Sequence, residues 1–81
     1  MPVLARFNGV VIRMYFQQSE HNPPHIHVFY GSCVSAIEIK TGNVLDGFLP
    51  MKILVMVKEW INNHEVELLE IWATQEFKLL K

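Results

Sequence analysis

The sequence predicts an α+β domain in which an N-terminal antiparallel β-meander of four to five strands carries two C-terminal helices on one face. Two observations lead to this prediction. In the first half, short segments alternate apolar and polar residues with the period of β-strands, and turn signals separate them. In the second half, apolar residues recur at helical spacing. Strands followed by helices favour α+β over alternating βαβ units, and short connections favour a meander.

The first hairpin is predicted from Asn8-Gly9, a pair that favours the positive φ angles of a tight turn. Strands over residues 3–7 and 10–16 should flank it. In the second strand alternate residues are all apolar and should face the core. They are Val10, Ile12, Met14 and Phe16. Arg13 and Tyr15 should then point the other way.

The polar segment 17–24 ends in two prolines, which cannot donate to a sheet ladder, and it predicts a loop. Alternation resumes over 25–30 and 33–40, around a turn at Gly31-Ser32. A short last strand over 44–48 follows a further turn signal. The residues of these strands expected to face the core are Ile26, Val28, Tyr30, Ile37 and Ile39.

Two helices are predicted in the second half. Pro50 suits the first helical position, where its missing N–H would have no partner. The stripe of the first helix is Ile53, Leu54, Val57, Trp60 and Ile61. Asn62-Asn63 should break it, and Asn62 with Glu65 resembles a capping box for a second helix over 63–76. That helix should bury Leu68, Leu69, Ile71 and Trp72.

Composition favours a single domain spanning residues 1–81. The chain is short for two domains, and 51% hydrophobic against 19% charged residues excludes a disordered chain. So much apolar surface in so short a chain predicts an exposed patch, and with it a protein partner or a homo-oligomer.

Net charge indicates which class of partner is favoured, and the cysteine content indicates the redox state of the compartment. The net charge of −1, with scattered Lys and Arg, does not support nucleic-acid binding, although a local patch is left open. Cys33 is the single cysteine, which fits a reducing compartment, and is expected to be a small buried residue. No apolar run reaches the roughly 18 residues of a membrane helix and no signal-peptide pattern is seen, so we expect a cytoplasmic protein.

Chemistry is expected on the sheet face turned away from the helices. That face should carry Arg13, Tyr15, His25, His27, Glu38 and Lys40. His25 and His27 are two apart on one strand, so their side chains project about 6–7 Å from each other on the same face. This spacing would let the pair share a metal, a phosphate or a proton-transfer task.

Two catalytic interpretations follow. In the first, His25 and His27 bind a divalent metal with His21 or Glu38 as third ligand. Two histidines alone specify no metal, and the C-x-x-C and H-E-x-x-H spacings of strong metal motifs are absent. No other cofactor is expected. In the second, the two histidines exchange protons with a phosphate or ester while Arg13 or Lys40 holds the anion. Neither a nucleophile motif nor a phosphate loop accompanies them.

Two non-catalytic interpretations compete with these. The same face and the loop 21–24 would form a recognition surface for a protein or a nucleic-acid element. Its binding residues would be Arg13, Tyr15, His21, Asn22, His25, His27 and Glu38. Alternatively the histidines belong to an ordinary solvated sheet face, or their imidazoles bond to the backbone near the Pro-Pro corner and fix the loop.

Several segments together resemble a family of small prokaryotic proteins. They are Ile12-Arg13-Met14-Tyr15-Phe16, Asn22-Pro23-Pro24-His25-Ile26-His27-Val28, Gly47-Phe48-Leu49-Pro50, Glu59-Trp60, His64, Glu67-Leu68 and Trp72. On them the chain resembles the domain-of-unknown-function 4160 family over nearly its whole length. The resemblance implies no activity and assigns no catalytic residue. Members resemble partners of a second small domain encoded next to them, an arrangement similar to toxin–antitoxin modules.

The hypothesis that unites these observations is a small intracellular interaction or regulatory module, one component of a two-gene prokaryotic system. Its partner would be a small protein encoded nearby, with a homo-oligomer as a further expectation. The alternative is a small hydrolase or nuclease, metal-assisted or not, that uses His25 and His27.

Overall fold

The computed structural model describes residues 3–15 and 23–80, and within them five strands precede two helices. The strands are β1 (Val3–Phe7), β2 (Val10–Arg13), β3 (His25–Tyr30), β4 (Cys33–Glu38) and β5 (Val44–Gly47). The helices are α1 (Met51–Asn63) and α2 (Glu65–Thr74). The predicted α+β class is confirmed. Over the described residues, neither helix is long and apolar enough to cross a membrane.

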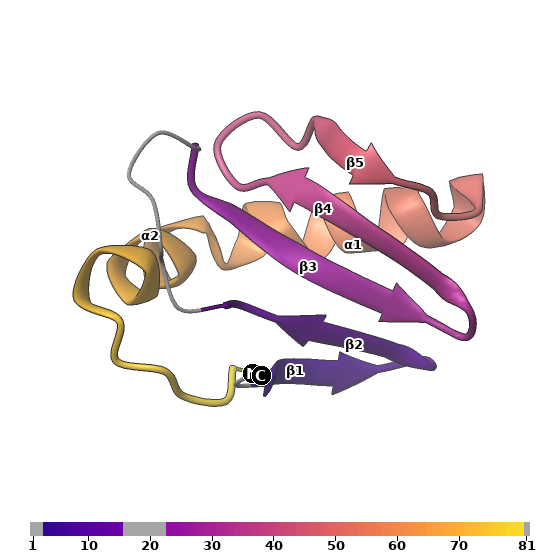
Figure 1. The fold of residues 1–81 in the computed structure, drawn as a ribbon. Coiled ribbons are helices and arrows are strands. Elements are labelled where there is room, and N and C mark those ends of the chain that lie inside the picture. The colour runs from indigo at the N-terminus through magenta and orange to yellow at the C-terminus, as the bar shows by residue number, and fades with distance from the viewer. Residues whose placement is uncertain (1–2, 16–22, 81) are drawn as a thin grey trace.

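The strands form one antiparallel sheet in the order β1-β2-β3-β4-β5, which confirms the meander (Figure 1). Asn8 and Gly9 join β1 to β2 with φ angles of 48° and 81°, as the turn signal predicts. Across β2 and β3, Arg13 is the partner of His27. Across β3 and β4, His25 is the partner of Glu38. The three central strands are therefore neighbours.

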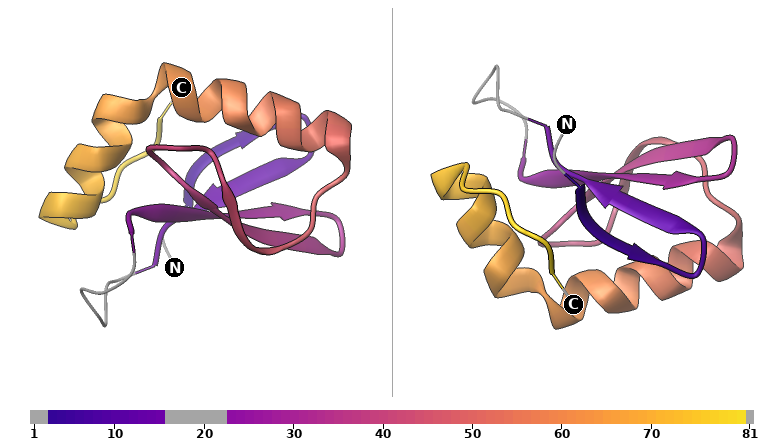
Figure 2. Two further views of the ribbon diagram at one scale, coloured as in Figure 1. Left: turned by 90° about the horizontal axis from the view of Figure 1, so that it is seen from above. Right: turned by 90° about the horizontal axis from the view of Figure 1, so that it is seen from below.

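Both helices lie on the same side of the sheet, and α2 turns away from the direction of α1 at one end (Figure 2). Between the layers lies a core to which every element except β5 contributes, together with Leu49 and Leu80. The predicted core residues of the sheet that are buried are Val10, Ile12, Met14, Ile26, Val28, Ile37 and Ile39. Tyr30 and Cys33 are half-buried against this core. The prediction for Phe16 falls outside the described residues.

The strands β2, β4 and β5 end earlier than predicted, and for β4 the hydrogen bonds show why. The amide of Ile39 donates to the carbonyl oxygen of Pro24 at 2.9 Å. Pro24 has no N–H to return the bond, so the ladder cannot continue. The chain then turns, with Gly42 donating to Glu38 at 2.9 Å. Lys40 therefore lies in a turn beyond β4 rather than on a strand.

The junction of the helices differs from the prediction. α1 continues through Asn63 and ends at His64, whose backbone N–H and ring Nδ1 both lie within reach of the carbonyl oxygen of Trp60, at 3.1 and 2.9 Å. The capping box of Asn62 and Glu65 does not form, since α2 has no side-chain cap bond. α2 ends at Thr74, because Gln75 takes a left-handed conformation with φ of 62°.

The segment after α2 returns to the sheet (Figure 1). The amide of Leu80 donates to the carbonyl oxygen of Leu4 on β1, and the Leu80 side chain is buried. Leu79 beside it is exposed. This segment therefore adds one backbone bond to the edge of the sheet at β1, opposite the exposed edge strand β5.

Candidate functional site

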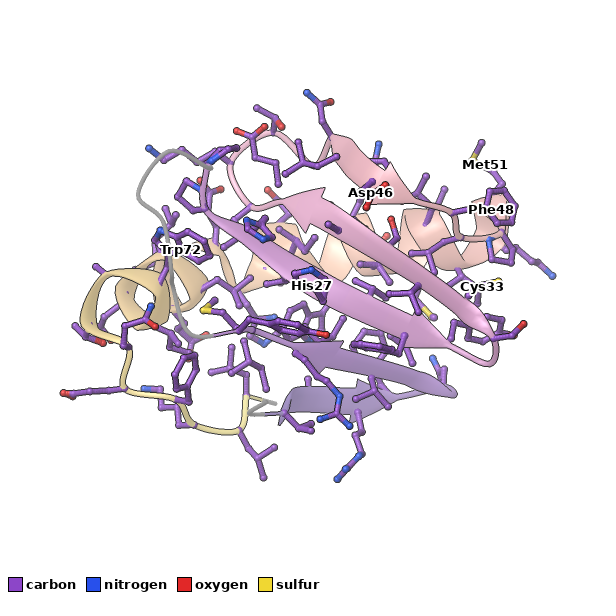
Figure 3. All side chains as sticks on the ribbon, in the orientation of Figure 1. His27, Cys33, Asp46, Phe48, Met51 and Trp72 are labelled. Atoms are coloured by element: carbon purple, nitrogen blue, oxygen red, sulfur yellow. The ribbon has the colours of Figure 1, made fainter. Side chains whose placement is uncertain are left out.

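The candidate site is on the sheet face turned away from α1, where Figure 3 shows His27. The pleat of β3 places both predicted histidines on this face. Ile26 and Val28 point into the core and are buried, so His25 and His27 point the other way. Both histidines are half-buried rather than fully solvated. The structure thus places them together on the predicted face.

Four rings form a continuous strip across this face and onto α2. Tyr15 stacks on His27 with ring centroids 4.2 Å apart and planes inclined by 25°. His27 meets His25 edge-on at 5.2 Å, and His25 meets Trp72 at 5.1 Å. We call Tyr15, His27, His25 and Trp72 the aromatic strip. Ring contacts on both sides restrict the orientation of each imidazole.

His25 is anchored to the loop that precedes β3. Its Nδ1 lies 2.9 Å from the carbonyl oxygen of Pro23. A carbonyl oxygen only accepts, so Nδ1 carries a proton and donates. This bond supports the interpretation in which an imidazole fixes the Pro-Pro corner. It also leaves Nε2 as the ring atom of His25 that can serve another partner.

The ring of His27 is not anchored by a hydrogen bond at Nδ1 as the ring of His25 is. Among the described side-chain N and O atoms that are fully buried, its Nδ1 is the one without a hydrogen-bond partner. Burial lowers the pKa of His27 below its ordinary value, and the nearby His25 lowers it further, while Asp46 opposes both. The neutral imidazole is therefore favoured.

Arg13 on β2 is the partner of His27 across the sheet, so it lies on the predicted face. Its guanidinium carbon is 5.5 Å from the centroid of the Phe29 ring, a cation–π distance. Tyr15 follows at the end of the same segment and is 38% exposed, so part of its ring is available to a partner. Arg13 and Tyr15 thus border the histidines on the β2 side.

The acidic and basic candidates on β4 behave differently from each other. Glu38 is the partner of His25 across the sheet, so it lies on the predicted face, and its side chain is half-buried. Lys40 was predicted there as well, and that prediction is wrong. Because Pro24 ends the ladder, Lys40 instead lines a hollow beside α1 with Lys58 and Asn62.

A metal site receives limited support from the described part of the chain. Within residues 3–15 and 23–80, no three His, Cys, Asp or Glu side chains are grouped so as to hold a metal ion. His25, His27 and Glu38 therefore do not form a three-ligand set by themselves. His21 and Asn22 lie outside the described residues, so a set completed by His21 stays a prediction.

Two neighbours of the histidines were not predicted as site residues. Trp72 belongs to an apolar helical stripe and was assigned to the core; it packs against the core and also contacts His25. Asp46 acts on His27 because β5 pairs Asp46 with Ala36, which is itself the partner of His27. Nothing in the sequence spacing indicates that Trp72 lies near His25. The position of Asp46 near His27 can be inferred only when the register of β5 is known.

A second exposed feature lies away from the histidines, where β5 leads into α1 (Figure 3). Phe48 is 68% and Met51 73% exposed. Val55, one turn further along α1, is exposed as well. We call these three residues the apolar corner. It is the kind of exposed patch that the composition predicts.

The fold and site define a class: a small two-layer α+β domain with one sheet face covered by helices and the other carrying an aromatic strip around two histidines. The domain of unknown function DUF4160 matches residues 9–73. The chain therefore belongs to the domain-of-unknown-function 4160 family, as its sequence motifs suggest. No curated protein and no solved structure matches it.

Proposed function

We propose that this protein is a small cytoplasmic interaction or regulatory module that binds a second small protein, encoded nearby, through the aromatic strip and its border. The observation that carries the proposal is the strip itself. Tyr15, His27 and His25 pack against one another on the sheet face turned away from α1, and Trp72 of α2 extends the strip at the end of that face. Tyr, Trp and Arg are the residue types that most often dominate binding energy in protein interfaces.

The setting of the strip supports recognition. Its rings hold one another in place, so little side-chain entropy would be lost on binding. Arg13, over Phe29, adds a planar cation at the border. The resemblance of family members to two-gene toxin–antitoxin modules supports a protein as the partner, and the net charge of −1 gives no support to a nucleic acid.

The test is affinity capture with the tagged chain in its native cells, followed by identification of bound protein and reconstitution from purified components. A double variant, His25→Ala with His27→Ala, should reduce binding of the reconstituted partner at least tenfold. Val66→Ala with Leu79→Ala is the matched control, because it removes two exposed apolar side chains elsewhere. Phe48→Ala with Met51→Ala tests the other exposed surface, the apolar corner. Thermal unfolding of each variant verifies that the fold persists.

The outcomes separate the surfaces. Loss of the reconstituted complex in the histidine variant alone supports the proposal. A partner that binds both histidine variant and wild type equally, or that is lost only with Phe48 and Met51, would contradict the assignment of the strip.

The apolar corner supports a second component of the proposal, self-association. Phe48, Met51 and Val55 are large apolar side chains that are each more than half exposed, and exposed apolar patches often mark association surfaces. Light scattering during size-exclusion chromatography measures the mass directly. We expect a mass above that of one 9.4 kDa chain, reduced by Phe48→Ala with Met51→Ala. A monomer at high micromolar concentration would refute self-association.

One observation favours a hydrolase or nuclease as the alternative function. The lowered pKa of His27 favours its neutral form beside His25, and a neutral imidazole can accept a proton as a general base. Hydrolysis of bis-p-nitrophenyl phosphate and p-nitrophenyl acetate, with and without added divalent cations, tests it. Turnover abolished by His27→Ala, with binding of the partner retained, would favour the enzyme over the module.

A further inference from the structure

The two histidines of the aromatic strip differ in the surroundings of Nδ1, and these surroundings determine which ring nitrogen carries the proton. In His25, Nδ1 donates to the carbonyl oxygen of Pro23 at 2.9 Å. The proton of the neutral ring is therefore on Nδ1. Its Nε2 then has a lone pair and acts as an acceptor.

His27 has the opposite arrangement. Its buried Nδ1 has no hydrogen-bond partner. A buried N–H without an acceptor is rarer and more costly than a buried lone pair, so the proton of the neutral ring belongs on Nε2. His27 Nε2–H then acts as a donor. Tyr15, stacked at 4.2 Å, holds the plane of this ring in place.

The site consequently pairs one donor with one acceptor on rings whose centroids are 5.2 Å apart. We propose that this pair recognises the side-chain carboxamide of an Asn or Gln residue on the partner protein. The carboxamide oxygen would accept from His27 Nε2–H, and its NH₂ group would donate to His25 Nε2. This inference rests on the proposed function and names the chemistry that the strip selects.

Other groups match the pair less well. A carboxamide has its oxygen and its NH₂ group at the same end, so it can meet two neighbouring rings at once. In a trans peptide group the C=O and N–H point in opposite directions. A carboxylate only accepts hydrogen bonds. It could therefore accept from His27 Nε2–H, but it would place a negative charge against the lone pair of His25 Nε2.

The first experiment observes the protons directly. Nitrogen-15 NMR of the ring atoms in the full chain at pH 8, with labelled histidine, distinguishes the two tautomers. We expect Nδ1–H for His25 and Nε2–H for His27. His64 is an internal reference, because its Nδ1 is held by the carbonyl oxygen of Trp60 at 2.9 Å. The reverse tautomer at either His25 or His27 would overturn the inference.

The second experiment titrates three small probes into the same sample: propionamide, N-methylacetamide as a trans peptide group, and acetate. Propionamide should shift the ring signals of both His25 and His27 and leave His64 unchanged. N-methylacetamide should shift no more than one ring, and acetate should not shift the two together. Equal responses to all three, or no response to propionamide, would overturn the inference.

A pair of variants then isolates the acceptor. His25→Asn can still donate to Pro23 from its side-chain NH₂ group but lacks the Nε2 acceptor, so its affinity for propionamide should fall about three- to tenfold. His25→Gln places an oxygen near the former Nε2 position and should retain more of the affinity. Equal affinities for the two variants would contradict the role of Nε2.

Failure of this inference and failure of the proposed function are distinguishable. A partner that is captured through His25 and His27 while the tautomers are reversed leaves the interaction module standing and removes the carboxamide. The expected tautomers and propionamide response, without any reconstituted protein complex, would retain the carboxamide site and remove the module.

Discussion

Tyr15 lies nearly flat on His27, with ring centroids 4.2 Å apart and planes inclined by 25°. Tyr15 follows the end of β2, whereas His27 is in the middle of β3. The contact exists because the meander makes these strands neighbours and pairs Arg13 with His27. It shields one face of the imidazole from water, and burial is the largest cause of the lowered pKa of His27.

Removal of Tyr15 should therefore raise the pKa of His27. Tyr15→Ala opens the ring to water, which reduces the cost of charging it, whereas Tyr15→Phe keeps the stacked ring. Proton or nitrogen-15 NMR titration of His27 measures both variants. We expect the pKa to rise towards 6.5 in Tyr15→Ala and to change little in Tyr15→Phe. An unchanged pKa in Tyr15→Ala would show that Tyr15 does not shield the ring.

Stability should depend on pH through His27. The unfolded chain has the ordinary pKa of 6.5 at this residue, and the folded chain has a lower value. Between the two values the unfolded state binds more protons, so the free energy of unfolding increases with pH. The contribution is complete above 6.5 and is lost as pH falls through the folded pKa.

Urea denaturation between pH 8 and pH 5 measures this dependence. The slope should be smaller in His27→Gln, which has no titrating ring at this position. Comparing the two chains removes the contributions of the other histidines. Parallel curves for the wild type and the variant would contradict a lowered pKa in the folded state.

Gly47 should be intolerant of a side chain. It has φ of 80°, and a Cβ built there would lie 2.0 Å from the carbonyl oxygen of Val34 on the neighbouring strand. Gly47→Ala should cost more than the roughly 1–3 kcal/mol of left-handed strain, because β4 and β5 would also have to separate. Gly31→Ala is the control, with φ of 59° and no atom within 4 Å of the added Cβ. Equal urea midpoints for the two variants would refute the close approach.

Leu68 should be a major contributor to stability, because it is completely buried in the core between α2 and the sheet. Leu68→Ala should reduce the free energy of unfolding by about 2–5 kcal/mol. Leu79→Ala deletes the same atoms from a side chain that is 71% exposed, and it should change stability by less than about 0.5 kcal/mol. Chemical denaturation of both proteins makes the comparison, and similar losses would mean that α2 is not docked as described.

The strand faces were predictable because their signal is local. Alternation in β2 and β3 placed Ile12 and Val28 in the core and His27 on the opposite face, and the structure confirms all three. Asn8-Gly9 predicted its turn for the same reason. The ends of the helices were less predictable than the strand faces. Asn62-Asn63 resembles a helix end, yet α1 continues to Asn63, and His64 satisfies the carbonyl oxygen of Trp60.

Within the site, the residues of neighbouring strands were predictable and those of other elements were not. Arg13 and His27 share a face because the meander makes their strands neighbours, and the register of β2 with β3 then makes them partners. The contact of Trp72 with His25 depends on the direction that α2 takes after His64, for which spacing contains no information. Lys40 was misplaced because the absent N–H of Pro24, a partner across the sheet, ends the ladder.

The sequence by itself determined the α+β class, the meander, the core faces and the pairing of His25 with His27 on one strand, because these depend on the periods of strands and helices. Only the tertiary structure decided what surrounds that pair. The stacking of Tyr15, the approach of Trp72 and the buried Nδ1 of His27 arise from packing between segments far apart in the chain. Those contacts set the chemistry of the two rings.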